Sequence, residues 1–274
     1  MAMLKQIVAH KRKEISWRRR RLPQSRLEEL CRAHGPTVSL SFTAALRRGK
    51  AENGMALIAE MKKKSPSKGL LRADFSPTAI ARDYTRGGAH ALSVLTDSSF
   101  FGGRLHHLDM ARRVTALPLL RKDFIIDPYQ VYEARAHGAA AVLLIAALLS
   151  PSLLAELAAL TVALGMDPLV EVHDEADLAK VLSALPGLTI IGINNRDLGT
   201  FETSLSATRQ LLPLLPRDVL VVSESGISGR HDIEQLMEWG VAAVLVGEWL
   251  MRRSDPVSGV KELLGKEDRD VALH

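Results

Sequence analysis

Short apolar runs alternate with helical patterns along most of this chain, and this alternation restricts the folds that it can adopt. Apolar runs of this length are typical of strands that are buried on both faces of a sheet. Eight of them occur, at residues 55–59, 91–95, 117–121, 141–145, 167–170, 189–193, 219–222 and 241–246. Patterns of helical period lie between them, for example at residues 78–86, 128–137, 153–164 and 229–239. This alternation predicts a (β/α)8 barrel (TIM barrel), a fold that usually takes about 250 residues.

The length of the chain, 274 residues, agrees with one barrel. A doubly wound open sheet is the alternative, but it needs fewer strands, and no Gly-x-Gly-x-x-Gly sequence follows the first run. We predict a single domain over residues 1–274, in which residues 1–54 form an N-terminal helical extension. Two or three helices are expected in this extension, because its apolar residues recur at helical spacing. These residues are Leu4, Ile7, Val8, Leu27, Leu30 and Cys31.

The composition excludes several classes of protein. The hydrophobic content of 47% is that of a globular domain, and no apolar run reaches the ~20 residues needed to span a bilayer. Charged residues interrupt the N-terminal segment, so it does not have the profile of a signal peptide. Cys31 is the single cysteine, which excludes an intrachain disulfide and is consistent with a reducing cytoplasm. We therefore expect a cytoplasmic protein with no membrane partner, and we favour a monomer.

The chain is basic, with a net charge of +5 and an isoelectric point of about 9.4. Such a balance suits a nucleic acid, a membrane surface or an anionic small substrate. The densest basic runs are residues 11–13 and 17–21. Apart from Trp17 they lack the aromatic residues of a nucleic-acid-binding patch, and no known binding module accompanies them. We interpret both runs as the solvated face of an N-terminal helix and predict no nucleic-acid partner.

Polar residues follow most of the apolar runs, and the first run shows the pattern most clearly. Glu60 and Lys62 come directly after residues 55–59. Residues i and i+2 of a strand point to the same face, so these two side chains should project together. A turn-forming sequence, Ser65-Pro66-Ser67, then ends the segment. An acid and a base at the exit of a buried strand suit a catalytic rim, and a surface ion pair is the alternative.

The last two predicted strands are followed by loops that suit a phosphate. Gly226 follows the seventh run and Gly247 follows the eighth. In (β/α)8 barrels the loops after these two strands often bind phosphate through backbone N–H groups and a helix N-terminus. Ordinary turn glycines are the alternative at each position. Glu248 should present its backbone N–H to the phosphate while its carboxylate points away.

Seven segments, long and in order, together resemble the indole-3-glycerol phosphate synthase family over residues 7–256. The segments are Glu60-x-Lys62-x-x-Ser65-Pro66-Ser67, Leu95-Thr96-Asp97 with Phe100-Phe101-Gly102-Gly103, Arg121-Lys122-Asp123-Phe124-Ile125, Glu171-Val172-His173, Ile191-Gly192-Ile193-Asn194-Asn195-Arg196-Asp197-Leu198, Ser223-Glu224-Ser225-Gly226-Ile227 and Leu245-Val246-Gly247-Glu248. The resemblance implies a (β/α)8 barrel with an N-terminal helical extension. It also implies conversion of a small phosphorylated substrate, 1-(2-carboxyphenylamino)-1-deoxyribulose 5-phosphate, to indole-3-glycerol phosphate, with loss of carbon dioxide and water. No metal and no organic cofactor are expected.

The resemblance also implies roles for individual residues. Lys122 is the candidate general acid for ring closure, and we expect burial and neighbouring cations to lower its pKa. Glu171 resembles the family's acid–base carboxylate. Lys62 resembles the lysine that holds the anthranilate carboxylate, and which of the two lysines protonates the leaving hydroxyl stays open. The residues expected to orient lysines and substrate hydroxyls are Glu60, Asn194 and Glu224.

Substrate-binding residues are implied in the same way. Phe101 and Phe124 match positions that line the pocket for the anthranilate ring. Leu143 and Leu198 are its expected apolar walls, although core packing is an equal alternative for both. Further contacts to the substrate are expected from Ser65, Arg196 and Ser225. The phosphate-binding residues are Gly226, Gly247 and Glu248.

Other functions remain open on the sequence alone. A different phosphosugar barrel enzyme is one, either an isomerase or an aldolase that forms a Schiff base through Lys122. A non-catalytic barrel that keeps the phosphate site is another. His173 is expected to have a structural role, and the adjacent His106 and His107 have poor spacing for a metal on a helix.

Overall fold

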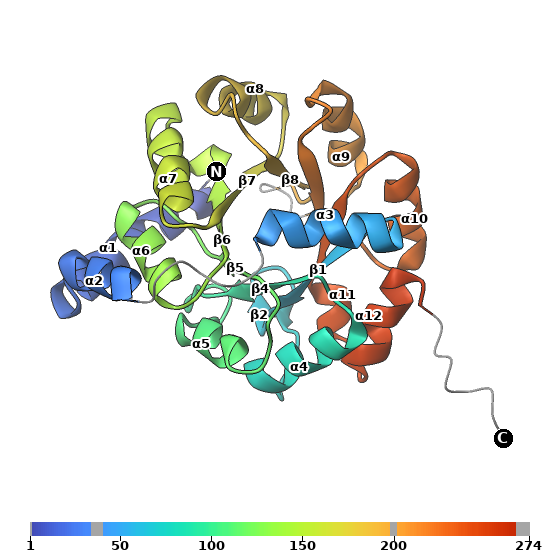
Figure 1. Cartoon of the computed structure of the whole chain (residues 1–274), viewed down its shortest axis with the longest axis horizontal. Coiled ribbons are helices and arrows are strands. Elements are labelled where there is room, and N and C mark those ends of the chain that lie inside the picture. The colour runs from blue at the N-terminus through green and yellow to red at the C-terminus, as the bar shows by residue number, and fades with distance from the viewer. Residues whose placement is uncertain (1, 34–40, 198–201, 267–274) are drawn as a thin grey trace.

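The computed structural model describes residues 2–33, 41–197 and 202–266, which form a closed parallel barrel surrounded by helices (Figure 1). The predicted (β/α)8 fold is therefore confirmed. Around the barrel the strands follow the order β1-β10-β9-β8-β7-β6-β5-β4. Their bounds are Ala56–Met61 (β1), Ala91–Leu95 (β4), Leu119–Lys122 (β5), Ala141–Ile145 (β6), Asp167–Val172 (β7), Ile190–Asn194 (β8), Leu220–Glu224 (β9) and Ala243–Val246 (β10).

Several strands run one or two residues beyond the apolar runs that predicted them. Glu60, Glu171 and Glu224 therefore lie within the last two residues of β1, β7 and β9, and not in the loops that follow these strands. Ladder hydrogen bonds join backbone groups, so they continue through polar residues, as where Asn194 of β8 lies opposite Glu224. The consequence is that these side chains are held by regular structure and not by loops.

Helices follow the strands in the order expected for this fold. Four of them begin with a proline directly after a capping Ser or Asp, as at Ser76, whose Oγ accepts a hydrogen bond from the Ala79 backbone N–H. Their bounds are Pro77–Gly87 (α4), His106–Arg112 (α5), Pro128–Ala136 (α6), Pro151–Ala163 (α7), Glu175–Ala184 (α8), Ser206–Leu211 (α9), Arg230–Glu238 (α10), Glu248–Met251 (α11) and Pro256–Leu264 (α12). Two short 3-10 helices cover Ala146–Leu148 (η1) and Leu212–Leu214 (η2), and an antiparallel ribbon joins Lys64–Ser65 (β2) to Gly69–Leu70 (β3).

In the described residues before β1 there are three helices, where the sequence predicts two or three: α1 (Ala2–Arg21), α2 (Gln24–Ala33) and α3 (Phe42–Asn53). The third lies across one end of the barrel (Figure 1), where Phe42 and Leu46 are fully buried in a cluster with the first residues of the strands, such as Ala56. This helix closes the N-terminal end of the barrel interior with apolar side chains.

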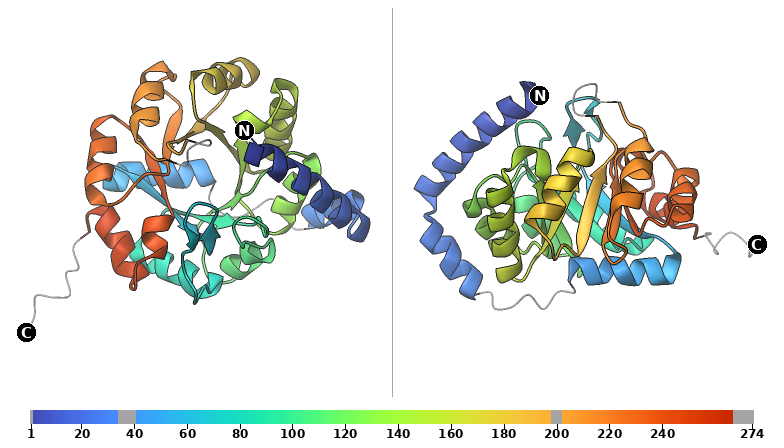
Figure 2. Two further views of the ribbon diagram at one scale, coloured as in Figure 1. Left: turned by 180° about the vertical axis from the view of Figure 1, so that it is seen from behind. Right: turned by 90° about the horizontal axis from the view of Figure 1, so that it is seen from above.

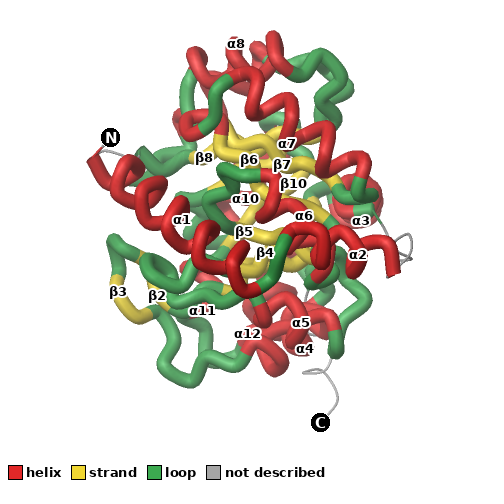
Figure 3. The backbone as a smooth tube through the Cα atoms, turned by 90° about the vertical axis from the view of Figure 1, so that its left-hand side faces the viewer, coloured by secondary structure: helices red, strands yellow, loops and turns green. Residues whose placement is uncertain are grey.

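The start of α1 and the β2–β3 ribbon lie at the opposite end of the barrel (Figure 2, Figure 3). The expectation that basic run 11–13 is wholly solvated is wrong for Lys11, which is 1% exposed. Its ammonium pairs with two buried carboxylates, Asp97 and Asp123. Within run 17–21, Arg18 is also drawn to the barrel, by Glu133 at 3.1 Å. Of the helices in the described ranges, none is both long and apolar enough to cross a membrane.

Candidate active site

A cavity of about 690 Å3 opens at the C-terminal ends of the strands. It brings together the predicted site residues that the structure describes, from strands that are far apart in the sequence. These are Glu60, Lys62, Ser65, Phe101, Lys122, Phe124, Leu143, Glu171, Asn194, Arg196, Glu224, Ser225, Gly226, Gly247 and Glu248. The remaining residue, Leu198, lies outside the described residues.

Lys122 lies at the centre of this cavity, at the end of β5. Its Nζ is 3.0 Å from Oε2 of Glu171 on β7, and it also donates a hydrogen bond to Oε2 of Glu224 on β9. The Lys122 side chain is 15% exposed, while those of Glu171 and Glu224 are 6% and 1% exposed. One ammonium is therefore shared by two carboxylates that water reaches poorly.

The carboxylates around Lys122 shift its pKa in the direction opposite to the one expected from the sequence. Burial alone lowers the pKa of Lys122, but Glu171, Glu224 and Glu60 outweigh it, and the pKa is raised above its ordinary value. The expectation of a lowered pKa is wrong, because the neighbours that surround Lys122 are carboxylates and not cations. Lys122 is consequently a charged ammonium at neutral pH.

The pKa of Glu224 is raised, whereas the pKa of an ordinary ion-paired carboxylic acid is lowered. Burial raises the pKa of Glu224 to about 7, with Lys122 opposing the rise and Glu171 adding to it. Two carboxylates cannot both be fully stabilised by one ammonium in a poorly hydrated site. This group can therefore gain or lose a proton near neutral pH.

Glu60 and Lys62 form a second ion pair beside the first, with Oε2 and Nζ 2.8 Å apart. Glu60 is 4% exposed, which excludes the alternative of a surface ion pair. Burial alone raises the pKa of Glu60, but Lys62, Lys122 and a hydrogen bond from Ser93 lower it overall. This carboxylate is thus held in its charged form, and its charge reaches both lysines.

Asn194 links the carboxylate of Glu171 to the next loop. Its side-chain N–H donates to Oε1 of Glu171 at 3.2 Å, and its Oδ1 accepts from the backbone N–H of Arg196 at 3.0 Å. His173 contacts the backbone carbonyl oxygen of Asn194 through Nδ1, at 2.9 Å. These bonds fix the orientation of Glu171 toward Lys122 and give His173 the structural contact that was expected.

Apolar side chains form the opposite wall of the cavity. The rings of Phe101 and Phe124 lie 6.1 Å apart at 42°, a tilted arrangement that favours contact between ring edge and face. Leu143 also lines the cavity, is 2% exposed, and belongs to the interior core of the barrel. Leu143 therefore serves core packing and lines the cavity at once.

The loops after β9 and β10, where phosphate binding was predicted, both contribute residues to the lining of the cavity. Ser225 and Gly226, which directly follow β9, have positive φ values of 65° and 78°. Gly247 precedes α11, whose first residue is Glu248. The Glu248 carboxylate is engaged by Arg252 at 3.3 Å, on the helix surface.

Two glycines have a role that the sequence analysis missed. A Cβ at Gly192 would lie 2.2 Å from Oε1 of Glu224, and one at Gly247 would lie 2.3 Å from Oε2 of Glu60. Each glycine therefore leaves the space that a site carboxylate occupies. Sequence alone gives a signal only in the pairing of a strand glycine with a glutamate on the next strand.

The N-terminal helix was also missed as part of this cavity. Leu4 and Ile7 of α1 are among the residues that line it. The helical spacing of these residues was visible in the sequence, but the surface on which they pack was not.

In the described part of the chain there is no group of three or more His, Cys, Asp or Glu residues that could hold a metal ion.

The model of one protein family, described as indole-3-glycerol phosphate synthase, matches residues 4–263. The chain belongs to the indole-3-glycerol phosphate synthase family. A relative of that name from a Roseiflexus species is 49% identical over 271 residues, which cover 96% of this chain and 98% of the relative. Another from Microcystis aeruginosa is 47% identical over 266 residues, covering 95% and 88%.

Among solved structures, 3-hexulose-6-phosphate synthase from Salmonella typhimurium superposes with a TM-score of 0.62. The match covers 77% of this chain and 97% of that one, at 12% sequence identity. At that identity the likeness supports the barrel fold alone. The family assignment rests on the match over residues 4–263 and on the two relatives above.

Proposed function

We propose that this protein closes the indole ring of 1-(2-carboxyphenylamino)-1-deoxyribulose 5-phosphate and releases carbon dioxide and water to give indole-3-glycerol phosphate, a step of tryptophan biosynthesis. Family membership supports this activity. The observation that carries the mechanism is the position of the Lys122 ammonium between Glu171 and Glu224, inside a cavity that also holds the Glu60–Lys62 pair.

Ring closure needs an acid. The anilino ring carbon attacks the ketone carbon, and the electron pair of the C=O bond moves to the oxygen, which takes up a proton. Lys122 is charged at neutral pH because three carboxylates raise its pKa. An alkoxide is a much stronger base than an amine, so the proton transfer is favourable once the C–C bond forms. The ammonium also stabilises the developing negative charge before it transfers the proton.

The next steps need a site for the carboxylate and a base. Lys62 is proposed to hold the anthranilate carboxylate until the C–C bond to that carboxylate breaks and carbon dioxide leaves. Glu171 is proposed to act as the acid–base group in the loss of water. Glu224, with a pKa of about 7, can return a proton to Lys122 after each cycle. The side-chain N–H of Asn194 donates to Oε1 of Glu171 at 3.2 Å and so orients this carboxylate for its proposed role.

Binding is proposed to use the remaining lining residues. The rings of Phe101 and Phe124 suit the apolar anthranilate ring. The backbone N–H groups of Gly226 and Glu248 are proposed to bind the phosphate, with Gly247 in the loop after β10. The residues proposed to contact the substrate hydroxyls and carboxylate are Ser65, Arg196 and Ser225.

A Schiff-base aldolase is disfavoured by the same geometry. Such an enzyme needs a neutral lysine amine, whereas Lys122 is held as an ammonium by Glu171 and Glu224. A spectroscopic assay of indole-3-glycerol phosphate formation tests the proposed function directly. Borohydride trapping of a covalent adduct, with no indole product, would instead indicate the aldolase.

The size and location of the active species are further proposals. A monomer, a cytoplasmic location and a single domain over residues 1–274 stay predictions. Light scattering after size-exclusion chromatography tests the first, cell fractionation the second, and a single unfolding transition the third.

A further inference from the structure

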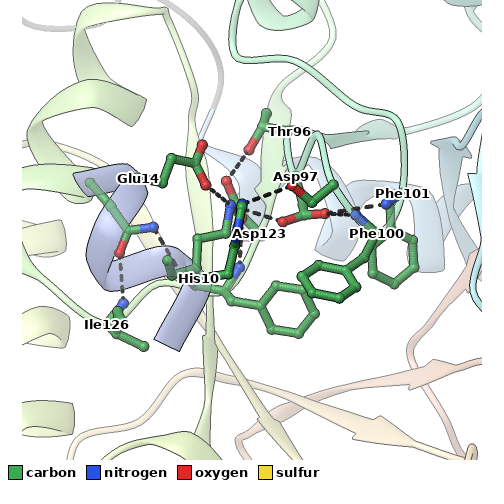
Figure 4. A network of polar contacts seen from close by, with 12 residues as sticks. His10, Glu14, Thr96, Asp97, Phe100, Phe101, Asp123 and Ile126 are labelled. Atoms are coloured by element: carbon green, nitrogen blue, oxygen red, sulfur yellow. Dashed lines mark hydrogen bonds and ion pairs between the residues drawn. The ribbon is translucent and has the colours of Figure 1, made fainter. Parts of the chain in front are cut away.

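The most buried cation of the N-terminal helix, Lys11, is not among the residues that line the cavity, yet it pairs with Asp97 and Asp123. Figure 4 shows these two aspartates with Phe100 and Phe101. We propose that Lys11 of α1 is a positioning residue, whose ammonium joins Asp97 to Asp123 and so sets the positions of Phe101 and Phe124 in the substrate pocket. This role deepens the proposed function and rests on it.

The burial of Lys11 shows that its contacts are specific. The side chain is 1% exposed, and its Nζ lies 2.8 Å from Oδ1 of Asp123, 3.0 Å from Oδ2 of Asp97 and 2.8 Å from Oε2 of Glu14. A buried ammonium is costly unless it is paired, so three carboxylates around it form a built site and not a chance contact. Burial alone lowers the pKa of Lys11, but Asp123, Asp97 and Glu14 raise it above its ordinary value of 10.5.

Asp97 connects Lys11 to the first aromatic residue. It lies just after β4, and its Oδ1 accepts hydrogen bonds from the backbone N–H groups of Phe100 and Phe101, at 2.7 and 3.2 Å. The carboxylate is 0% exposed. Within the residues that the structure describes, Lys11 is the one cation paired with it. The turn that presents Phe101 is therefore built on a carboxylate that Lys11 neutralises.

Asp123 connects Lys11 to the second aromatic residue. It directly follows Lys122, and its Oδ1 accepts a hydrogen bond from the backbone N–H of Phe124 at 2.8 Å. Its Oδ2 accepts from Thr96 at 2.6 Å and from Arg121 at 3.1 Å. Because Thr96 precedes Asp97, the two aspartates are also joined through the end of β4.

The same helix binds the first turn at a second point. Nε2 of His10 is 2.7 Å from Oγ of Ser99, and the His10 ring lies edge-on to Phe100 with centroids 6.0 Å apart. Docking of α1 and the shape of the turn at residues 97–103 are therefore linked (Figure 4). Loss of Lys11 leaves the buried carboxylate of Asp97 without the cation that pairs with it, so the turn built on this carboxylate must rearrange.

A change in this turn affects substrate binding more than chemistry. Phe101 and Phe124 are proposed to contact the anthranilate ring in the ground state and in the transition state alike, so loss of the contact raises KM. The contacts of Lys122 with Glu171 and Glu224 involve neither aspartate. The pH dependence of kcat should therefore stay that of the wild type.

The test compares Lys11→Met with Lys13→Met, an exposed lysine on the same helix. We expect Lys11→Met to raise KM by about tenfold and to change kcat by less than about threefold, and Lys13→Met to change neither. A role in global stability alone would reduce the amount of active enzyme and leave KM unchanged. An unchanged KM in a folded Lys11→Met enzyme overturns the proposal.

A double variant isolates the route through Asp97. Asn at this position keeps the Oδ1 that accepts from Phe100 and Phe101 but removes the charge that Lys11 balances. Lys11→Met with Asp97→Asn should therefore recover most of the wild-type KM, and it also serves if Lys11→Met alone does not fold. A double variant as weak as Lys11→Met would overturn the route through Asp97.

Hydrogen exchange measures the same coupling without any substrate. In Lys11→Met, amide exchange in the segments 97–103 and 122–127 should be at least about tenfold faster than in the wild type, and in Lys13→Met it should be unchanged. Unchanged exchange in Lys11→Met would count against the proposal. If the wild-type enzyme makes no indole-3-glycerol phosphate, the proposed function fails, while the exchange result still decides the role of Lys11.

Discussion

The carboxylate of Glu60 occupies the space beside the Cα of Gly247, where any larger residue would place its Cβ 2.3 Å from Oε2. Gly247→Ala should therefore displace Glu60 from Lys62 and lower turnover by at least about tenfold, in addition to any effect on the phosphate. Gly229→Ala is the matched control, because a Cβ there meets nothing within 4 Å. Steady-state kinetics of both variants checks this, and equal turnover in the two would contradict it.

Replacement of Lys122 removes the proposed acid. Lys122→Met should keep the fold and lose at least about 100-fold in turnover. Lys122→Arg should not restore it, because the guanidinium gives up its proton too reluctantly. Circular dichroism establishes folding and the product assay measures turnover. Near-normal turnover in either variant would remove Lys122 from the mechanism.

Glu171→Gln keeps the shape of the side chain and removes its titratable group. It should lower turnover by at least ~10²-fold with little change in KM, since the group acts in proton transfer and not in binding. Glu60→Gln should instead alter the pH dependence of turnover, because Glu60 is one of the carboxylates that raise the pKa of Lys122. Wild-type turnover in Glu171→Gln across the pH range would show that another group carries the proton.

The pKa values of Glu224 and Glu60 predict stability changes of opposite sign. Glu224 has a folded-state pKa of about 7, above its ordinary 4.5, so its stabilising contribution is complete below pH 4.5 and is lost as the pH rises through about 7. Glu224→Gln should thus raise the melting temperature at pH 8 relative to the wild type. This gain should shrink or vanish at pH 5.

Glu60→Gln serves as the matched comparison. The pKa of Glu60 in the wild type is lowered below the ordinary 4.5. The contribution of Glu60 to folding stability is therefore present above pH 4.5 and is lost as the pH falls. This variant should melt below the wild type at pH 8. Thermal unfolding of both variants at the two pH values tests the pair, and shifts of the same sign at pH 8 would refute it.

The proposed phosphate site can be probed by charge. Gly226→Glu should weaken inhibition by inorganic phosphate and raise KM, because it fills the loop and repels the anion. Gly240→Glu is its control, since both glycines have positive φ, 78° and 90°, and so share the same backbone cost. A crystal soaked in sulfate should show the anion at the N–H groups of Gly226 and Glu248. Density on residues 18–21 alone would disprove the site.

The barrel could be predicted because each apolar run corresponds to a strand, and polar residues at the ends of those strands meet at one end of a parallel barrel. The pair Glu60–Lys62 followed from the two-residue repeat of a strand alone. The sequence does not predict the distances between side chains that lie on different strands. The direction of the Lys122 pKa shift depends on Glu171 and Glu224, which lie 49 and 102 residues further along the chain.

The burial of Lys11 was hidden for a related reason. A run of basic residues is usually solvated, and the hydropathy of residues 11–13 does not show which one faces the barrel. Asp97 and Asp123 come from later strands, so the pairing appears only when α1 docks. The glycine at position 192 gave the same difficulty, because its value lies in the space it leaves for Glu224.

The position of α3 at the N-terminal end of the barrel has a consequence for synthesis of the chain on the ribosome. β1 pairs with β10, so one edge of the first strand stays without a neighbour until residues 243–246 have been translated. Such an edge is prone to pair with the wrong chain. α3 is made before β1 and carries Phe42 and Leu46, which belong to the same cluster as Ala56 and Ala243. The apolar partners of the start of β1 are therefore translated before that strand, whereas its backbone partner β10 is the last strand of the barrel to be translated.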